Sequence, residues 1–156
     1  MSINLSSSHR KEEPESGVLY LVGTPIGNLS DISSRALNIL KNVSLIACED
    51  TRQTRKITSK FEISNKLISF NKHNSLIKIP KIIQFLREGK SVALVSDAGL
   101  PSICDPGEDL VKKANLNKLA TICVPGPSAA LTALISSGFP ASCLLYTSDA
   151  ADDLLC

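Results

Sequence analysis

The sequence predicts an α/β protein with a mostly parallel sheet and flanking helices. Three observations support this fold class. Short apolar runs rich in β-branched residues recur along the chain, and stretches with helical spacing of apolar residues separate them. Turns rich in glycine and proline stand at 23–28, 97–107 and 125–127. Strands that alternate with helices in this way pair in parallel, because a helix is the usual crossover between parallel strands.

The first third of the chain contains two of the expected strands. The first, VLYLV at 18–22, is followed by the loop GTPIGN at 23–28, and Asp31 is a suitable N-cap for the next helix. The apolar residues of that helix recur at helical spacing: Ile32, Ala36, Ile39, Leu40 and Val43. A second strand at 45–48 ends in acidic residues and leads into a basic helix over 53–61.

The middle of the chain continues this alternation. A short third strand is expected at 67–70, and Ser75 can cap a helix that runs to 88 and stops at Gly89. The fourth strand, 92–95, is apolar at every position, which is typical of a strand buried on both faces. A helix over 108–114 is expected after the loop that follows this strand.

The loop after the fourth strand is the stretch that most favours a ligand site. Gly99 allows the backbone to approach a ligand closely, while Pro101 and Pro106 stiffen the loop. Open α/β sheets bind their ligands beyond the carboxyl ends of such strands. The alternative is a turn that only connects strand and helix. A last strand at 120–124 leads through Pro-Gly-Pro into a helix over 128–136.

The composition is that of an ordinary globular domain of 156 residues, 43% hydrophobic and 21% charged. We expect a disordered leader over 1–16, one α/β domain over 17–140, and a tail over 141–156 that breaks the pattern and is not native. The leader lacks the apolar centre of a signal peptide. No apolar run approaches the ~20 residues of a membrane span. We therefore expect a cytoplasmic protein without a membrane partner.

Positive charge is concentrated near the middle of the chain. Ten Lys and Arg residues lie between Thr51 and Lys90, against two acids, Glu62 and Glu88. Such an excess can neutralise the phosphates of a nucleic acid. The alternative is a pair of helices whose lysines face only solvent.

Other site patterns are excluded. Gly89-Lys90-Ser91 imitates the end of a phosphate-binding P-loop, but Gln84 stands where that motif needs its first glycine. The first strand is not followed by the GxGxxG pattern of a dinucleotide site. Glu49 and Asp50 have no third acid or histidine spaced to complete a metal site, so no metal is expected.

Five segments together resemble one known family. They are GTPIGNLSDI, ACEDTR, KHN, VSDAGLPSICDPG and VPGPSA, and they occur in this order between residues 23 and 129. In these segments the chain resembles the amino-terminal half of the RNA-directed members of the tetrapyrrole-methylase-like family of S-adenosylmethionine enzymes. The resemblance extends over about 17–140.

This resemblance implies two α/β domains that bind S-adenosylmethionine in the cleft between them. It also implies a homodimer that methylates the ribose 2′-hydroxyl of a cytidine in 16S rRNA, within the small ribosomal subunit. The sequence ends before the second domain, so the chain alone is expected to be inactive. Two alternatives stay open: a non-catalytic fragment that binds RNA or dimerises, and an enzyme that methylates a tetrapyrrole precursor.

The resemblance also assigns the cofactor-binding residues to two segments. They are Asp97, Ala98, Gly99, Leu100, Pro101, Ser128 and Ala129. Asp97 can attract the positive charge of the methyl donor, and the Ser128 hydroxyl at a helix N-terminus can bind its carboxylate. The alternative for Ser128 is a simple N-cap.

Glu49 and Asp50 are the candidate catalytic residues. A ribose hydroxyl is a poor nucleophile, and a base that takes its proton can accelerate the reaction by ~10²–10⁴-fold. The alternative is that these two acids cap the next helix or pair with its arginines. Asn28 is expected to orient the substrate. The remaining substrate-binding residues are expected to hold RNA phosphates: Arg52, Arg55, Lys56, Lys72 and His73.

Overall fold

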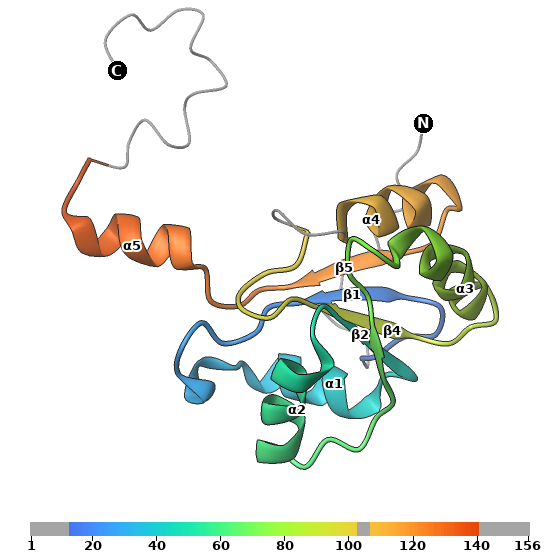
Figure 1. The fold of residues 1–156 in the computed structure, drawn as a ribbon, viewed down its shortest axis with the longest axis horizontal. Coiled ribbons are helices and arrows are strands. Elements are labelled where there is room, and N and C mark those ends of the chain that lie inside the picture. Colours follow the sequence, from blue (N-terminus) through green and yellow to red (C-terminus); the bar gives the residue numbers. More distant parts are fainter. Residues whose placement is uncertain (1–12, 103–106, 141–156) are drawn as a thin grey trace, which may run out of the picture.

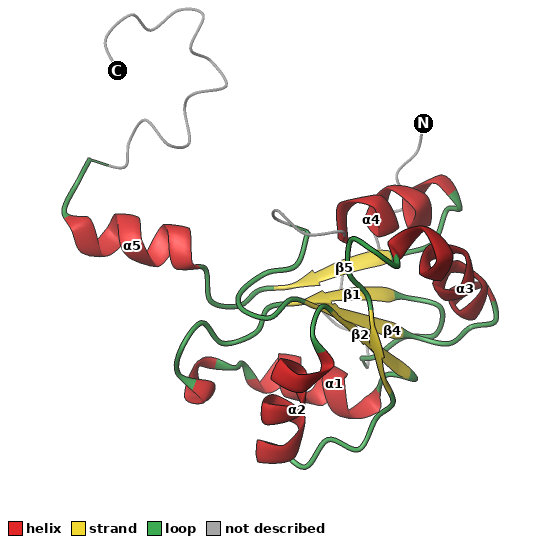
Figure 2. Ribbon diagram, viewed as in Figure 1, coloured by secondary structure: helices red, strands yellow, loops and turns green. Residues whose placement is uncertain are grey.

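The computed structural model describes residues 13–102 and 107–140, and a parallel sheet lies at their centre (Figures 1 and 2). Within the described residues the sheet has five strands in the order β3-β2-β4-β1-β5, and all neighbouring strands pair in parallel. This arrangement confirms the predicted fold class. The strands are β1 (Leu19–Val22), β2 (Leu45–Cys48), β3 (Leu67–Ser69), β4 (Val92–Val95) and β5 (Thr121–Val124).

Helices cover both faces of this sheet. The described helices are α1 (Ser34–Asn42), α2 (Thr51–Lys60), α3 (Ser75–Arg87), α4 (Gly107–Leu116) and α5 (Ala129–Ser137), with a short 3₁₀ turn, η1 (Leu29–Asp31). The helices α1 and α2 pack on one face, and α3 and α4 pack on the other. The helix α5 extends away from the sheet, and none of its residues is buried by the described part of the chain (Figure 1). No helix in that part is both long and apolar enough to cross a membrane.

Alternate residues of the strands pack into two separate hydrophobic cores, one on each face of the sheet. Tyr20 on β1 belongs to the core beneath α1 and α2, where it packs with buried residues such as Ile39. Its neighbour Leu19 faces the opposite way and joins the core that contains Ile82 of α3 and Leu110 of α4. Because successive side chains of a strand point to opposite faces, a central strand of this sheet must be apolar at every position.

The topology brings three loops together at the carboxyl edge of the sheet. The strand β1 lies between β4 and β5, so the loops that follow these three strands are neighbours. The connection after β1 leads to α1 on one face, whereas the connection after β4 leads to α4 on the other. Neighbouring connections that diverge in this way mark the position at which open α/β sheets bind ligands.

Helix starts differ from the predictions by one or two residues. Asp31 does not cap α1: it lies in η1, and the Ser33 hydroxyl caps α1 by accepting a hydrogen bond from the Ala36 amide at 3.1 Å. Asn74, rather than Ser75, occupies the N-cap position of α3. Serine, aspartate and asparagine all serve as caps, so composition alone does not select among neighbouring candidates.

The segment just before β1 is in contact with the folded domain. The Glu13 carboxylate accepts two hydrogen bonds, both 2.7 Å, from the Arg35 guanidinium on α1. The Glu15 amide donates to the Tyr20 hydroxyl at 2.7 Å. The end of the predicted disordered leader therefore differs from that expectation. Residues 1–12 of the leader and the predicted tail over 141–156 lie outside the described residues.

Candidate functional site

The loops after β1 and β4 are joined by reciprocal backbone hydrogen bonds. The Thr24 amide donates to the Gly99 carbonyl at 2.9 Å, and the Gly99 amide donates to the Thr24 carbonyl at 3.1 Å. The buried Thr24 hydroxyl adds a bond to the Ser96 carbonyl at 3.2 Å. These bonds fix the first half of the predicted cofactor loop. The sequence analysis did not identify Thr24, because nothing in the sequence around a threonine indicates that it will bond to residues as distant as Ser96 and Gly99.

Two glycines bring the loop after β5 against the loop after β1. A Cβ atom on Gly23 would lie 2.7 Å from the Gly126 Cα, and a Cβ on Gly126 would lie 2.7 Å from the Gly23 Cα. Backbone lies on both sides of this close approach, so no side chain can move to make room. Gly99 has a φ of +80°, and a Cβ there would lie 3.4 Å from the Pro127 carbonyl oxygen. The predicted cofactor segments around Gly99 and Ser128 are therefore neighbours.

Ser128 stands at the N-cap of α5, but its hydroxyl does not cap the helix. Its side chain makes no capping hydrogen bond within the described residues. Its carbonyl accepts bonds from the Thr132 amide at 2.9 Å and the Thr132 hydroxyl at 2.7 Å. The hydroxyl and the first amides of α5, at 129–131, thus have no described partner. Such groups at a helix N-terminus suit a carboxylate.

Asp97 connects the loop after β4 to the residues that follow β2. Its Oδ1 atom accepts a hydrogen bond from the Asp50 amide at 3.0 Å, across the carboxyl ends of β4 and β2. Its Oδ2 atom makes no hydrogen bond within the described residues. Of the other predicted cofactor residues in this loop, Ala98 is exposed, Leu100 half-buried and Pro101 buried.

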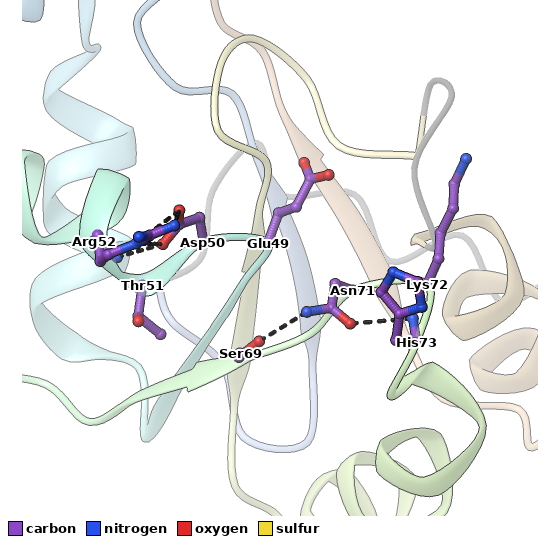
Figure 3. A pocket seen from close by; sticks show the side chains of 8 residues that line it. All are labelled: Glu49, Asp50, Thr51, Arg52, Ser69, Asn71, Lys72 and His73. Atoms are coloured by element: carbon purple, nitrogen blue, oxygen red, sulfur yellow. Dashed lines mark hydrogen bonds and ion pairs between the residues drawn. The ribbon is translucent and has the colours of Figure 1, made fainter.

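An open pocket lies beside Asp50, at the carboxyl ends of β2 and β3. Its volume is about 380 Å³. Figure 3 shows the lining residues, which are Glu49, Asp50, Thr51, Arg52, Ser69, Asn71, Lys72 and His73. Both predicted catalytic acids and three of the predicted substrate residues thus lie together. Three predicted substrate residues do not line the pocket. Arg55 and Lys56 are exposed on α2, and the Asn28 side chain caps η1 by accepting from the Ser30 amide at 3.0 Å.

The two acids of the pocket differ in their interactions. Asp50 caps α2 by accepting the Arg52 amide hydrogen at 2.8 Å, and its Oδ2 pairs with the Arg52 guanidinium at 2.8 Å. Hydrogen bonds from Arg52 hold the pKa of the Asp50 carboxyl below its ordinary value. The Glu49 side chain points away from this pair into the open pocket, and it makes no described hydrogen bond (Figure 3).

A network of amide side chains shapes the opposite wall of the pocket. The Asn74 Oδ1 atom accepts from the Asn71 amide at 3.0 Å, and the Asn71 Oδ1 atom accepts from the His73 amide at 3.1 Å. Both asparagines also donate to the Ser69 hydroxyl, at 3.2 and 3.3 Å. This tight turn leaves Lys72 and His73 exposed at the pocket rim. Only the spacing of the two asparagines could have indicated the network from sequence.

Comparisons with known proteins match most of the chain. The family described as Tetrapyrrole (Corrin/Porphyrin) Methylases matches residues 18–150. A relative from Streptococcus pyogenes, named ribosomal RNA small subunit methyltransferase I, is 54% identical over 128 residues, which are 82% of this chain and 45% of the relative. Proteins of the same name from Bacillus subtilis and Thermotoga maritima are 52% and 49% identical, over 78% and 83% of this chain and 42% and 59% of theirs. The chain spans about half the length of these curated relatives.

Solved structures show the same fold. The uroporphyrin-III C-methyltransferase of Thermus thermophilus superposes with a TM-score of 0.61 at 22% sequence identity, over 81% of this chain and 54% of that one. A second structure of this enzyme, in its native form, gives a TM-score of 0.59 at 17% identity, over 79% of this chain and 52% of that one. At such identities the likeness concerns the fold alone.

Proposed function

The chain belongs to the tetrapyrrole methylase family, and on that premise we propose that it supplies two parts of an S-adenosylmethionine-dependent rRNA methyltransferase. The first part is the donor wall, which consists of the neighbouring loops that contain Thr24, Asp97 and Ser128. The second part is the pocket beside Asp50, which takes the target nucleotide. The reaction is 2′-O-methylation of the ribose of a cytidine in 16S rRNA of the small ribosomal subunit, by a cytoplasmic homodimer. The observation that carries this proposal is the hydrogen bond from the Asp50 amide to Asp97, since it joins the predicted donor loop to the pocket that contains both acids and the exposed Lys72 and His73.

The residues of the donor wall fit S-adenosylmethionine. The Ser128 hydroxyl and the first amides of α5 suit its carboxylate, and the uncommitted Oδ2 atom of Asp97 suits its positive charge. When bound, the donor supplies a methyl group already activated on a sulfonium. The protein then has mainly to align donor and acceptor, and alignment of this kind is worth ~7–11 kcal/mol. The hydrogen bonds between Thr24 and Gly99 keep this wall rigid.

The pocket supports the acceptor half of the reaction. Glu49 is the better candidate for the base, because its carboxylate faces the open pocket whereas that of Asp50 is engaged by Arg52. Lys72 and His73 are exposed on the other side of the pocket, where they can bind RNA phosphates. Asp50 and Arg52 then fix the start of α2 rather than take part in proton transfer.

Ribosomal RNA is preferred over a tetrapyrrole as the substrate. The relatives with about half of their residues identical to this chain are named for ribosomal RNA. The solved structures named for uroporphyrin share 22% and 17% identity, and they support only the common fold. A methylation assay that offers both substrates tests this choice, and transfer to a porphyrin precursor alone would overturn it.

Donor binding is the direct test of the proposed wall. Calorimetric titration of the chain with S-adenosylmethionine is expected to show saturable binding. Ser128→Ala should weaken it by roughly tenfold, the value of one hydrogen bond to a charged group. Ser136→Ala is the matched control, because Ser136 lies near the other end of α5 and its hydroxyl donates to the Thr132 carbonyl at 2.7 Å. Equal affinities of the two variants would contradict the role of Ser128.

Two replacements of Asp97 separate charge from position. Asp97→Asn keeps an oxygen that can accept the Asp50 amide hydrogen but removes the charge, so donor affinity should fall roughly tenfold while RNA affinity is unchanged. Asp97→Ala removes both and should weaken RNA binding as well, since the loop before α2 is no longer held. Calorimetry for the donor and fluorescence anisotropy for RNA measure the two effects, with Asp109→Asn on α4 as the control. Unchanged donor affinity in Asp97→Asn would leave Asp97 only a positioning role.

Methyl transfer distinguishes catalysis from RNA binding alone. The chain is incubated with small ribosomal subunits that lack the modification and with methyl-labelled donor. Label recovered on a cytidine ribose supports catalysis by this chain. Binding of the subunits without transfer would instead assign the chain a role in RNA binding without turnover.

A further inference from the structure

The first turn of α3 exposes two large aliphatic side chains beside the pocket. Leu76 is 83% exposed and Ile77 is 68% exposed. The buried face of the same helix contains Ser75, Ile79 and Ile82. Helical spacing therefore turns residues 76 and 77 toward solvent, and their exposure follows from the packing of the whole helix. We call this pair the α3 shoulder.

Basic residues border the α3 shoulder without any intervening acid. The sequence from Lys72 to Lys81 contains three lysines and one histidine but neither Asp nor Glu. Lys72 and His73 belong to the pocket rim, so the shoulder continues directly from the pocket. Lys81 is exposed and lies one helical turn beyond Ile77, on the same side of α3. The surface thus combines a small apolar area with cations at both ends.

This combination fits single-stranded RNA better than a protein. Two side chains provide far less than the roughly 800 Å² that each partner contributes to a stable protein interface. A single strand, by contrast, needs cations for its phosphates and an apolar surface for each unstacked base. The uniformly basic border matches a polyanion.

We propose that the α3 shoulder holds an unstacked base of single-stranded RNA adjacent to the nucleotide in the pocket, while Lys72 and Lys81 hold the phosphates on either side. This inference rests on the proposed function, because it takes the pocket as the site of the target nucleotide. It extends the bound stretch of substrate beyond that pocket, along the outer side of α3, and it requires the neighbouring nucleotide to be unpaired.

Binding of a fluorescent single-stranded RNA to the chain, measured by anisotropy at several salt concentrations, tests this proposal. The double variant Leu76→Ser/Ile77→Ser should bind roughly tenfold more weakly with an unchanged salt dependence, because the apolar support for a base is removed and no cation is changed. Lys72→Ala/Lys81→Ala should lower the slope of log K against log salt by about 1.4, which is ~0.7 for each phosphate that is no longer neutralised. A duplex of the same sequence should compete poorly.

The helix α4 offers a matched control. Leu116 is 72% exposed there, and Leu116→Ser combined with Lys113→Ala makes the same kinds of change away from the pocket. This control should leave RNA affinity unchanged. Melting curves verify that all variants remain folded, as expected for exposed positions.

Three outcomes would overturn the proposal. The first is that the chain does not bind RNA. The second is that the shoulder variant binds RNA with unchanged affinity while Arg52→Ala binds it more weakly, and the third is that the shoulder variant changes only the sedimentation of the chain. The last outcome would make the shoulder a protein-binding surface. Absence of RNA binding would also count against the proposed rRNA substrate. The other two outcomes leave the proposed function intact, because the donor titration and the methyl-transfer assay test that function without use of the shoulder.

Discussion

Glu49→Gln, made in an enzyme that joins this chain to the second domain implied by the family resemblance, is expected to lower the rate of methyl transfer to small ribosomal subunits by about 10²–10⁴-fold, the usual contribution of a positioned general base. Glutamine keeps the size of the side chain but cannot take the proton of a ribose hydroxyl. Because Glu49 is exposed in the pocket, the free energy of unfolding should be unchanged. Single-turnover rates with labelled donor measure the effect.

Asp50→Asn is the matched control for this variant. Asp50 caps α2 and pairs with Arg52, so its replacement should lower the melting temperature more than the intrinsic rate. The pKa of Asp50 is held below its ordinary value by Arg52, and its carboxylate therefore stays ionised to lower pH than a free one. If Glu49 is the base, the rate of methyl transfer in folded Asp50→Asn stays close to that of the unchanged enzyme, whereas the rate in Glu49→Gln falls. The reverse pattern would transfer the role to Asp50.

Gly126→Ala is expected to destabilise the chain by about 1–3 kcal/mol, as overpacking does in a site that cannot relax. The new Cβ would lie 2.7 Å from the Gly23 Cα and 3.0 Å from the Gly23 carbonyl oxygen, and both of these atoms are backbone. The loops after β1 and β5 must separate, so S-adenosylmethionine should also bind more weakly. Denaturant unfolding and calorimetric titration measure the two consequences.

Gly89→Ala makes the same chemical change at the opposite edge of the sheet. A Cβ on Gly89 meets nothing within 4 Å, although its φ of +79° strains an alanine. This variant should lose some stability while donor affinity is unchanged. The double variant Gly23→Ala/Gly126→Ala should be less destabilised than the sum of its single variants, because one methyl group already separates the loops. Strict additivity would mean that the two glycines act independently.

The strands could be predicted from sequence because each is a short apolar run between turns. All five expected strands are present, with ends that agree to within one residue: the first begins at Leu19 rather than Val18, and the third ends at Ser69 rather than Phe70. Helix starts were predicted less well. The Asn28 side chain caps η1, and this places Asp31 inside a 3₁₀ turn and moves the cap of α1 to Ser33. Competition between neighbouring polar residues for the N-cap position cannot be predicted from the spacing of apolar residues.

The candidate site could be predicted as a set of residues but not as a geometry. Glu49, Lys72 and His73 do line one pocket. The hydrogen bond between Asp50 and Asp97 joins residues 47 positions apart, and no local pattern indicates it. The sequence also could not show that Arg52 engages Asp50 while Glu49 faces the pocket, since that difference depends on how β2 enters α2.

The position of β1 between β4 and β5 has a consequence for biosynthesis. Among the described strands β1 is translated first, yet Leu19 aligns with Val92 of β4 on one side and with Thr121 of β5 on the other. Both edges of this apolar strand therefore stay open until β4 and β5 have left the ribosomal tunnel, and open edges can pair with other nascent chains and lead to aggregation. Yield in an expression host will accordingly depend on growth temperature and chaperone supply more than on the equilibrium stability of the finished fold.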